Sequence, residues 1–346
     1  MSLRGKLSFG SALLRARMLG EIRPLFCQIS VTNRCNANCR YCNYRFRYPE
    51  EMSTGELLSV IDQLAELGTR RISLWGGEPL LRDDIGEIVA HIKSKGINCA
   101  MNSNGYLVPQ KREVVAMLDQ FALSLDGPKE AHDANREPGS YDKAIRALEV
   151  LKEMGIPTIT NVPFTKNNVS DKVIDFLLDH AEKYDYKISF LILKHTLEKG
   201  KRAWKFMPSD DQLRKAISKL ISEKRKGRPV LFSEFTYEMA RNWPDYSADR
   251  RSDGDLSWWR GPRCYAGRLS INIDTNGDLY PCAASTVGDQ EHMNCVRYGV
   301  RKALEYVSRH TCRVCYIPCR IEYNALFSLN PRVLLNVGLN YREKGL

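Results

Sequence analysis

The sequence predicts an α/β fold in which six β/α units form a partial (β/α)6 TIM-type barrel, followed by a small cysteine-rich C-terminal domain. Two observations support this. Short β-rich runs alternate with helical patterns from residue 26 to about residue 227, and six of the eleven cysteines lie between residues 263 and 323. The runs that we expect to form strands are 26–32, 71–75, 97–102, 121–125, 158–163 and 187–193.

Each predicted strand is followed by a loop and then by a helical stretch. Leu57, Val60, Ile61, Leu64 and Leu67, for instance, follow the i, i+3, i+4 spacing of an amphipathic helix. In parallel β/α folds, the loops after the carboxyl ends of the strands form one rim, where the chemistry takes place. We therefore expect the functional residues at this rim.

The chain divides into five predicted segments. Residues 1–25 form a basic amphipathic segment, 26–227 the barrel, 228–262 a linker or insertion with little periodicity, 263–323 the cysteine-rich domain and 324–346 a C-terminal tail. There is no apolar run long enough to span a bilayer, and no export signal. We expect a cytoplasmic protein whose cysteines bind metal or clusters, because their number is odd and the chain is long.

Lys and Arg outnumber Asp and Glu by 52 to 41, which gives a net charge of +11. Such a charge suits an acidic partner, a polyanion or an anionic membrane surface. The alternative is a generally basic surface without a partner. We do not predict nucleic-acid binding.

Three cysteines, Cys35, Cys39 and Cys42, follow the first predicted strand. Three thiolates can hold three irons of a [4Fe–4S] cubane, and the fourth iron then keeps the open coordination site that a catalytic metal needs. The alternatives are a zinc knuckle or unrelated loop cysteines. Zinc sites favour paired CxxC sets over an isolated triplet.

This CxxxCxxC spacing, with Tyr41 before the last cysteine, resembles the signature of the radical S-adenosylmethionine (SAM) superfamily. The resemblance implies that Cys35, Cys39 and Cys42 are the catalytic cluster ligands, and that Tyr41 belongs to the cofactor site. It also implies that SAM chelates the open iron. One electron then splits SAM into methionine and a 5′-deoxyadenosyl radical, which abstracts hydrogen from a substrate.

The second predicted strand runs into Gly76, Gly77, Glu78 and Pro79. Two glycines let the backbone approach a ligand closely, and Glu78 with backbone groups can satisfy an ammonium group. The segment is similar to the family's GGEP element, so the resemblance assigns these four residues to the SAM amino group. Taken alone, a Gly-Gly pair after a strand is more often only a turn.

Polar residues follow the third and fourth predicted strands, including Asn104, Ser124 and Asp126. Such groups can hydrogen-bond a ribose. Residues 132–141 are similar to a stretch of sulfatase-maturing and peptide-modifying radical SAM enzymes. That resemblance places Ser124 and Asp126 on the SAM ribose and the guanidinium fork of Arg136 on the SAM carboxylate. The alternatives are a tight turn at Asp126 and a solvated charge at Arg136.

The second module contains Cys264, Cys282 and a CxxC pair, Cys312 and Cys315, with a predicted strand and hairpin turn over residues 269–278. This order resembles the SPASM/twitch extension of radical SAM proteins, which carries one or two auxiliary [4Fe–4S] clusters. The spacing of the two-cluster form is missing. We therefore expect one auxiliary cluster, with these four cysteines as ligands.

Cys319 is an alternative fourth ligand to Cys315, and a structural zinc site is the alternative to the auxiliary cluster. Cys27 and Cys99 fall in apolar strand patterns and are predicted core residues. Cys295 is unassigned.

The net charge favours an acidic electron donor, flavodoxin or ferredoxin. The substrate is expected to be lipid-like or another small molecule. A basic amphipathic stretch with Arg15 and Arg17 and an apolar tail over residues 325–335 suggest peripheral membrane contact, although both could pack on the barrel. A peptide is the alternative, which the few residues before the first strand disfavour, since they leave no room for a leader-peptide domain.

A hypothesis from another class is a cluster-bearing electron carrier without SAM chemistry. The turn at Gly76 and Gly77 argues against it. An electron carrier has no need of an ammonium-binding loop beside an open iron.

Overall fold

The computed structural model describes residues 10–16, 18, 20–47, 50–193, 203–247, 250–251, 256–283, 292–310 and 312–344. Its main element is a nine-stranded sheet in the order β10-β9-β8-β1-β2-β3-β4-β5-β6. The strands are β1 Phe26–Thr32, β2 Arg71–Gly76, β3 Asn98–Ser103, β4 Gln120–Ser124, β5 Thr158–Phe164, β6 Lys187–Ile192, β8 Ser270–Ile273, β9 Asp278–Tyr280 and β10 Met293–Asn294. Strands β1 to β6 are parallel, and each agrees with a predicted strand to within one residue at either end.

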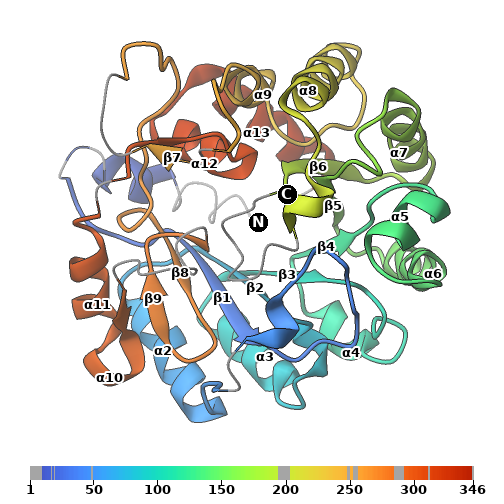
Figure 1. Cartoon of the computed structure of the whole chain (residues 1–346). Coiled ribbons are helices and arrows are strands. Elements are labelled where there is room, and N and C mark those ends of the chain that lie inside the picture. Colours follow the sequence, from blue (N-terminus) through green and yellow to red (C-terminus); the bar gives the residue numbers. More distant parts are fainter. Residues whose placement is uncertain are drawn as a thin grey trace.

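Helices cover the outer side of these strands and close the open side of their arc. Figure 1 shows α2 to α7 outside the curved sheet, with α12 and α13 facing its open side. The helices are α2 Thr54–Glu66, α3 Ile85–Ser94, α4 Arg112–Ala116, α5 Lys129–Asn135, α6 Ser140–Glu153, α7 Asp171–Tyr184, α8 Asp210–Arg225, α9 Glu234–Arg241, α10 Cys295–Tyr298, α11 Val300–Val307, α12 Pro318–Phe327 and α13 Pro331–Lys344. The predicted α/β partial barrel is confirmed.

Alternation along the strands explains the two faces of the sheet. In β1, Cys27, Ile29 and Val31 belong to the main hydrophobic core, whereas Gln28 faces the inside of the barrel. The core side is completed by the apolar stripes of the helices, as predicted for α2. The inside of the barrel therefore carries polar side chains such as Gln28 beside apolar ones.

The cysteine-rich module continues the barrel sheet. β8 pairs parallel with β1, so that Gln28 lies opposite Asn272, and β9 then pairs antiparallel with β8. Gly277 in the connecting turn has φ of +85°, a conformation that favours glycine. The predicted hairpin is confirmed. It places the turn at the same end of the sheet as the loop after β1.

Residues 228–262, predicted as a linker or insertion, contain α9 and a cluster of aromatic side chains. The buried ring of Trp243 lies 5.4 Å from Trp258, 5.8 Å from Trp259 and 5.6 Å from Tyr316, measured between ring centroids. Tyr316 follows β11 (Val314–Cys315), which pairs with β7 (Arg250–Arg251). The Trp-rich composition of this segment therefore serves packing against the cysteine-rich module.

The amphipathic N-terminal stretch packs against the C-terminal part of the chain. Ala12, Leu13 and Ala16 are buried with Leu269 and Phe327 in a small hydrophobic cluster, while Leu14 and Met18 are exposed. Arg17 and Leu19 lie outside the described residues. In the part of the chain that the structure describes, no helix combines the length and apolarity needed to cross a bilayer.

Candidate active site

The loop after β1 carries three cysteines, Cys35, Cys39 and Cys42. Cys42 donates its backbone N–H to the carbonyl of Cys39 at 3.2 Å, and the thiols of Cys35, Cys39 and Cys42 lie close enough to interact electrostatically. Burial raises the pKa of Cys35 to about 11 and that of Cys42 to about 12, and it also raises the pKa of Cys39. Without a cation among them, the three sulfurs therefore keep their protons.

Hydrogen-bond donors point at two of these sulfurs. Cys35 Sγ lies 3.5 Å from the backbone N–H of Ala37 and 3.9 Å from Nδ2 of Asn104. Cys39 Sγ lies 3.6 Å from Nη1 of Arg136. Such donors favour sulfur in its anionic form, as in a cluster ligand. The loop thus has the donor set that fits an iron–sulfur cluster.

The GGEP turn lies directly against the cluster loop. Gly77 donates its N–H to the carbonyl of Thr32 at 2.7 Å, and Glu78 donates its N–H to that of Arg34 at 2.8 Å. A Cβ at Gly76 would come within 2.3 Å of the Thr32 carbonyl oxygen, and one at Gly77 within 2.1 Å of that of Arg34. Both glycines are required, because any side chain would force the two backbones apart.

Glu78 ties this turn to β3. Its buried carboxylate accepts from the backbone N–H of Leu80 at 3.1 Å, from Ser103 Oγ at 2.8 Å and from the backbone N–H of Asn104 at 2.8 Å. Pro79 begins the short 3₁₀ helix η2 (Pro79–Leu81) that Glu78 caps. Both carboxylate oxygens of Glu78 are therefore engaged by the protein itself.

The carboxyl group of Glu78 makes stability depend on pH. Burial raises its pKa from the usual 4.5 to about 7. Between these values the unfolded chain loses this proton while the folded chain keeps it, so the free energy of unfolding should fall by about 3 kcal/mol as pH rises through the window. Glu78→Gln should flatten this slope in urea denaturation series at about pH 5 and about pH 7.5. Glu56→Gln, at an exposed helix cap, should leave the slope in place, and an unchanged slope in Glu78→Gln would contradict the assignment.

Arg136, Asp126 and Tyr41 form one buried network beside the cysteines. Nε and Nη2 of Arg136 donate to the two carboxylate oxygens of Asp126 at 3.0 and 2.9 Å. Nη2 also lies 2.9 Å from Tyr41 Oη, which donates to Asp126 at 3.1 Å. The structure brings all three predicted residues together. One edge of the Arg136 guanidinium, which was predicted to bind the SAM carboxylate, contacts Asp126. Its Nη1 points toward Cys39.

Two further side chains support this network and were missed by sequence reasoning. His132 Nδ1 accepts the backbone N–H of Asp126 at 3.0 Å, and burial lowers the pKa of His132 to about 4, which keeps it a neutral acceptor. Glu137 accepts the N–H of Asn38 in the cluster loop at 2.9 Å. Ser124, a predicted ribose contact, ends β4 at the same rim.

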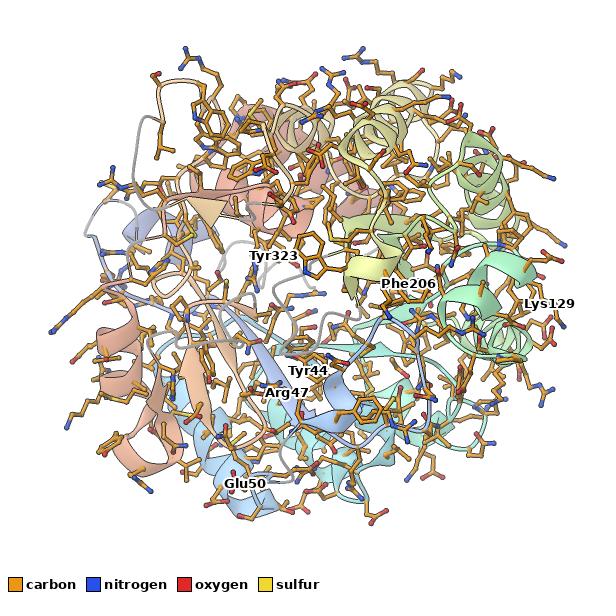
Figure 2. The ribbon with its side chains drawn as sticks, in the orientation of Figure 1. Tyr44, Arg47, Glu50, Lys129, Phe206 and Tyr323 are labelled. Atoms are coloured by element: carbon orange, nitrogen blue, oxygen red, sulfur yellow. The ribbon has the colours of Figure 1, made fainter. Side chains whose placement is uncertain are left out.

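The β8–β9 turn also holds the cluster loop. Arg47 donates from Nη1 and Nη2 to the carboxylate oxygens of Asp274 at 3.1 and 2.5 Å, and Asn33 Nδ2 donates to Thr275 Oγ1 at 2.8 Å. Figure 2 shows Arg47 beside Tyr44, whose ring centroid lies 5.0 Å from the guanidinium carbon. No sequence pattern indicated that these residues are in contact, because Arg47 and Asp274 are 227 positions apart.

The five predicted auxiliary cysteines converge near β11 and α12. Cys312 interacts with Cys264, Cys282 and Cys315, and Cys319 interacts with Cys282. The thiol contact between Cys264 and Cys312 lowers the pKa of Cys264 and raises that of Cys312. Across the described residues, no three His, Cys, Asp or Glu side chains are arranged around the position of a single metal ion.

The remaining cysteines are structural. Cys27 and Cys99 are buried in the main core, which confirms their prediction as core residues. Cys295 is buried as well, in the same core cluster and close to Cys27.

Comparison with known proteins identifies the family. Residues 29–178 match the Radical SAM superfamily. This match identifies residues 29–178 as a radical SAM domain. The three cysteines on the loop after β1 lie within the matched residues, and their donor set fits the [4Fe–4S] cluster that the resemblance implies.

Two curated relatives are similar to this chain over different lengths. An AdoMet-dependent heme synthase of Nitratidesulfovibrio vulgaris is 33% identical over 147 residues, covering 40% of either chain. The mycofactocin maturase MftC of Mycobacterium tuberculosis is 28% identical over 267 residues, covering 75% of this chain and 64% of the relative. The matches thus span roughly two fifths to two thirds of these relatives' lengths.

Solved structures share the fold. SuiB of Streptococcus suis bound to S-adenosylmethionine aligns with a TM-score of 0.67 at 18% identity, covering 85% of this chain and 68% of SuiB. Native anSMEcpe with bound AdoMet aligns with a TM-score of 0.63 at 17% identity, covering 91% of this chain and 100% of that one. These alignments cover the partial barrel and the cysteine-rich C-terminal region.

Proposed function

We propose that this chain is an enzyme that reductively cleaves SAM at a [4Fe–4S] cluster held by Cys35, Cys39 and Cys42. The convergence of these three thiols on a barrel rim, with donors aimed at sulfur, is the observation that carries the proposal. When bound, the cluster and SAM would supply an electron and a 5′-deoxyadenosyl radical that takes hydrogen from the substrate. Formation of 5′-deoxyadenosine on reduction is the test.

The protein's own groups would place SAM at the rim. The backbone of Gly76 and Gly77 would accept from the SAM ammonium, and Glu78 would act by fixing that turn, since the protein already occupies both of its oxygens. Arg136 would reach the SAM carboxylate through Nη1, the edge that faces Cys39. Asn104 and Ser124 would contact the ribose.

Asp126 has a different role in this proposal from the ribose contact that the sequence suggested. Its carboxylate accepts three hydrogen bonds from Arg136 and Tyr41, at 2.9 to 3.1 Å. Asp126 would therefore hold Arg136 so that the Nη1 edge of its guanidinium faces the cluster site. Tyr41 would contribute to the cofactor site through this same network.

We further propose one auxiliary [4Fe–4S] cluster, with Cys264, Cys282, Cys312 and Cys315 as ligands and Cys319 as the competing fourth ligand. Their mutual proximity supports a shared site. After anaerobic reconstitution, the protein should then contain about eight irons and no zinc. Four irons with near-stoichiometric zinc would contradict the second cluster and establish a structural zinc site.

An acidic electron donor, flavodoxin or ferredoxin, would supply the reducing electron. The net charge of +11 would steer such a donor to the protein. This attraction should weaken with ionic strength, because it acts through solvent.

For the substrate we propose a small, lipid-like molecule over a peptide. α13 exposes Leu334, Leu335 and Leu339, and the N-terminal stretch exposes Met18, which fits peripheral contact with a membrane. A peptide is the second candidate, because one similar solved structure is SuiB bound to its precursor peptide SuiA. In both cases the substrate must reach the inside of the barrel from the rim.

A further inference from the structure

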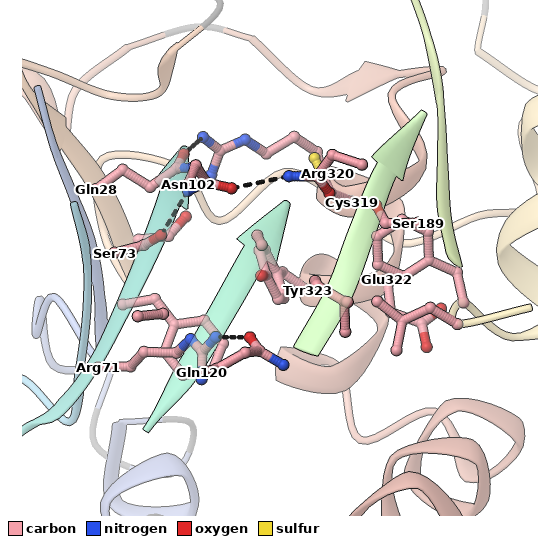
Figure 3. A pocket seen from close by; sticks show the side chains of 18 of the residues that line it. Gln28, Arg71, Ser73, Asn102, Gln120, Ser189, Cys319, Arg320, Glu322 and Tyr323 are labelled. Atoms are coloured by element: carbon pink, nitrogen blue, oxygen red, sulfur yellow. Dashed lines mark hydrogen bonds between the residues drawn. The ribbon is translucent and has the colours of Figure 1, made fainter. Parts of the chain in front are cut away.

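A cavity of about 240 Å³ lies inside the barrel, between the inner face of the sheet and α12 (Figure 3). Its sheet side carries a hydrogen-bonded row of polar side chains next to apolar residues such as Ile159 and Leu191. Asn161 donates to Asn102 at 2.8 Å, and Asn102 donates to Ser73 at 2.9 Å. The opposite side carries apolar groups, among them Phe232 and Leu326. The cavity thus combines a few polar groups with a larger apolar surface, which suits an amphipathic molecule.

The cavity wall extends along β3 to within two residues of the candidate active site. Asn102 lines the cavity, and two residues further along the chain Asn104 lies 3.9 Å from Cys35 Sγ. Between them, Ser103 donates to Glu78 of the GGEP turn. A ligand in the cavity would therefore have one end close to the cluster loop.

Arg320 brings a positive charge to the cavity wall. The residue is only 7% exposed, and its guanidinium donates from Nη2 to Gln28 Oε1 across the upper part of the pocket in Figure 3. A guanidinium has five donors. Among the described residues, this is the only hydrogen bond that the Arg320 guanidinium forms, and it forms no ion pair with a carboxylate. Most of its donors are therefore left for a ligand.

Among the described residues that line the cavity, Glu322 is the one carboxylate, and it does not balance the charge of the two arginines. Glu322 accepts from Ser233, Thr236 and Asn336, which hold both of its oxygens. A second guanidinium, that of Arg71, lies at the amino ends of the strands and donates to the amide oxygens of Asn98 and Gln120. Positive charge thus exceeds negative charge along the cavity, and buried charge demands a partner.

We propose that this cavity is the substrate pocket and that it takes a small amphipathic carboxylate, whose anionic group is bound by Arg320. The inference rests on the proposed function, because it names the substrate class for the same site. Arg320 is preferred over Arg71 because its guanidinium donors are less used and because it lies nearer the rim. The apolar part of the substrate would lie against Phe232 and Leu326.

The auxiliary cysteines lie close to the positive charge of Arg320 and would compete with the substrate for it. Arg320 interacts electrostatically with Cys282, Cys319 and Cys264. A loaded auxiliary cluster would share this arginine, so the experiment must separate loss of ligand binding from loss of iron.

The test uses the full-length, reconstituted protein without SAM. Binding of octanoate and of octan-1-ol, its uncharged analogue, is measured by isothermal titration calorimetry for the wild type, Arg320→Met and Arg71→Met. We expect octanoate to bind the wild type more tightly than octan-1-ol. Arg320→Met should weaken octanoate at least ten-fold, and Arg71→Met should change it less than three-fold. Iron content should be equal in all three proteins.

Several outcomes would overturn the proposal: no octanoate binding to the wild type, equal binding of both probes, or unchanged octanoate affinity in Arg320→Met. A larger loss of octanoate affinity in Arg71→Met than in Arg320→Met would place the anionic group at the amino ends of the strands. This result would also overturn the proposal. If Arg320→Met loses iron or fails to fold, Arg320→Gln decides, because it removes the charge and keeps a polar side chain; octanoate affinity equal to that of the wild type overturns the proposal. Formation of 5′-deoxyadenosine by the wild type is measured separately, so failure of the proposed function is recognised independently.

Discussion

Replacing Cys39 by Ala is expected to remove the rim cluster and leave only the auxiliary iron. Two thiolates cannot hold the three protein-bound irons of a cubane, and the donor from Arg136 would then face an empty position. After anaerobic reconstitution, iron should fall from about eight to about four per chain. Electron paramagnetic resonance of the reduced protein should lose any signal that changes when SAM is added.

Cys99→Ala is the matched control for this experiment. Cys99 lies in β3 and is fully buried in the core, away from the rim. Its loss should lower stability slightly without changing the iron content. A Cys39→Ala protein that kept eight irons and a SAM-sensitive signal would contradict the assignment of the rim ligands.

Asp274→Ala should destabilise the protein by about 3 kcal/mol, since it removes the buried carboxylate that faces the largely buried charge of Arg47. The side chain of Arg47 is 17% exposed and that of Asp274 is fully buried. The free energy of unfolding from urea titration measures the effect. Adding Arg47→Met to Asp274→Ala should restore part of the loss, because no charge then stays buried.

An exposed ion pair provides the comparison. Lys129 and Asp142 form a salt bridge with side chains 52% and 55% exposed, so Asp142→Ala should change stability little. Equal losses in Asp142→Ala and Asp274→Ala, or no recovery in the double variant, would show that the Arg47–Asp274 pair does not fasten the hairpin to the cluster loop.

The barrel strands could be predicted closely because their pattern is local. β1 to β6 are short runs bounded by turn residues, and burial on one face selects apolar residues at alternate positions. The pairing of β8 with β1 could not be predicted in this way. It joins residues more than 240 positions apart, and the sequence of neither strand indicates which strand it pairs with.

The candidate site shows the same division. The cysteine triplet and the GGEP turn were predictable because each chemical group lies within a few residues of the next. His132, Asp274 and Arg320 were missed because each acts through a partner distant in the sequence or through the backbone. The roles suggested for Glu78 and Asp126 also change in our proposal, since tertiary hydrogen bonds already engage their oxygens.

The proposed function depends on cleavage of SAM at the rim cluster. The most direct measurement is 5′-deoxyadenosine, quantified after anaerobic reduction of the reconstituted protein with SAM, for the wild type, Cys39→Ala and Cys99→Ala. We expect product from the wild type and from Cys99→Ala, and none above background from Cys39→Ala. Product from Cys39→Ala at the wild-type rate, or none from a wild-type protein that holds its full iron, would contradict the proposed function.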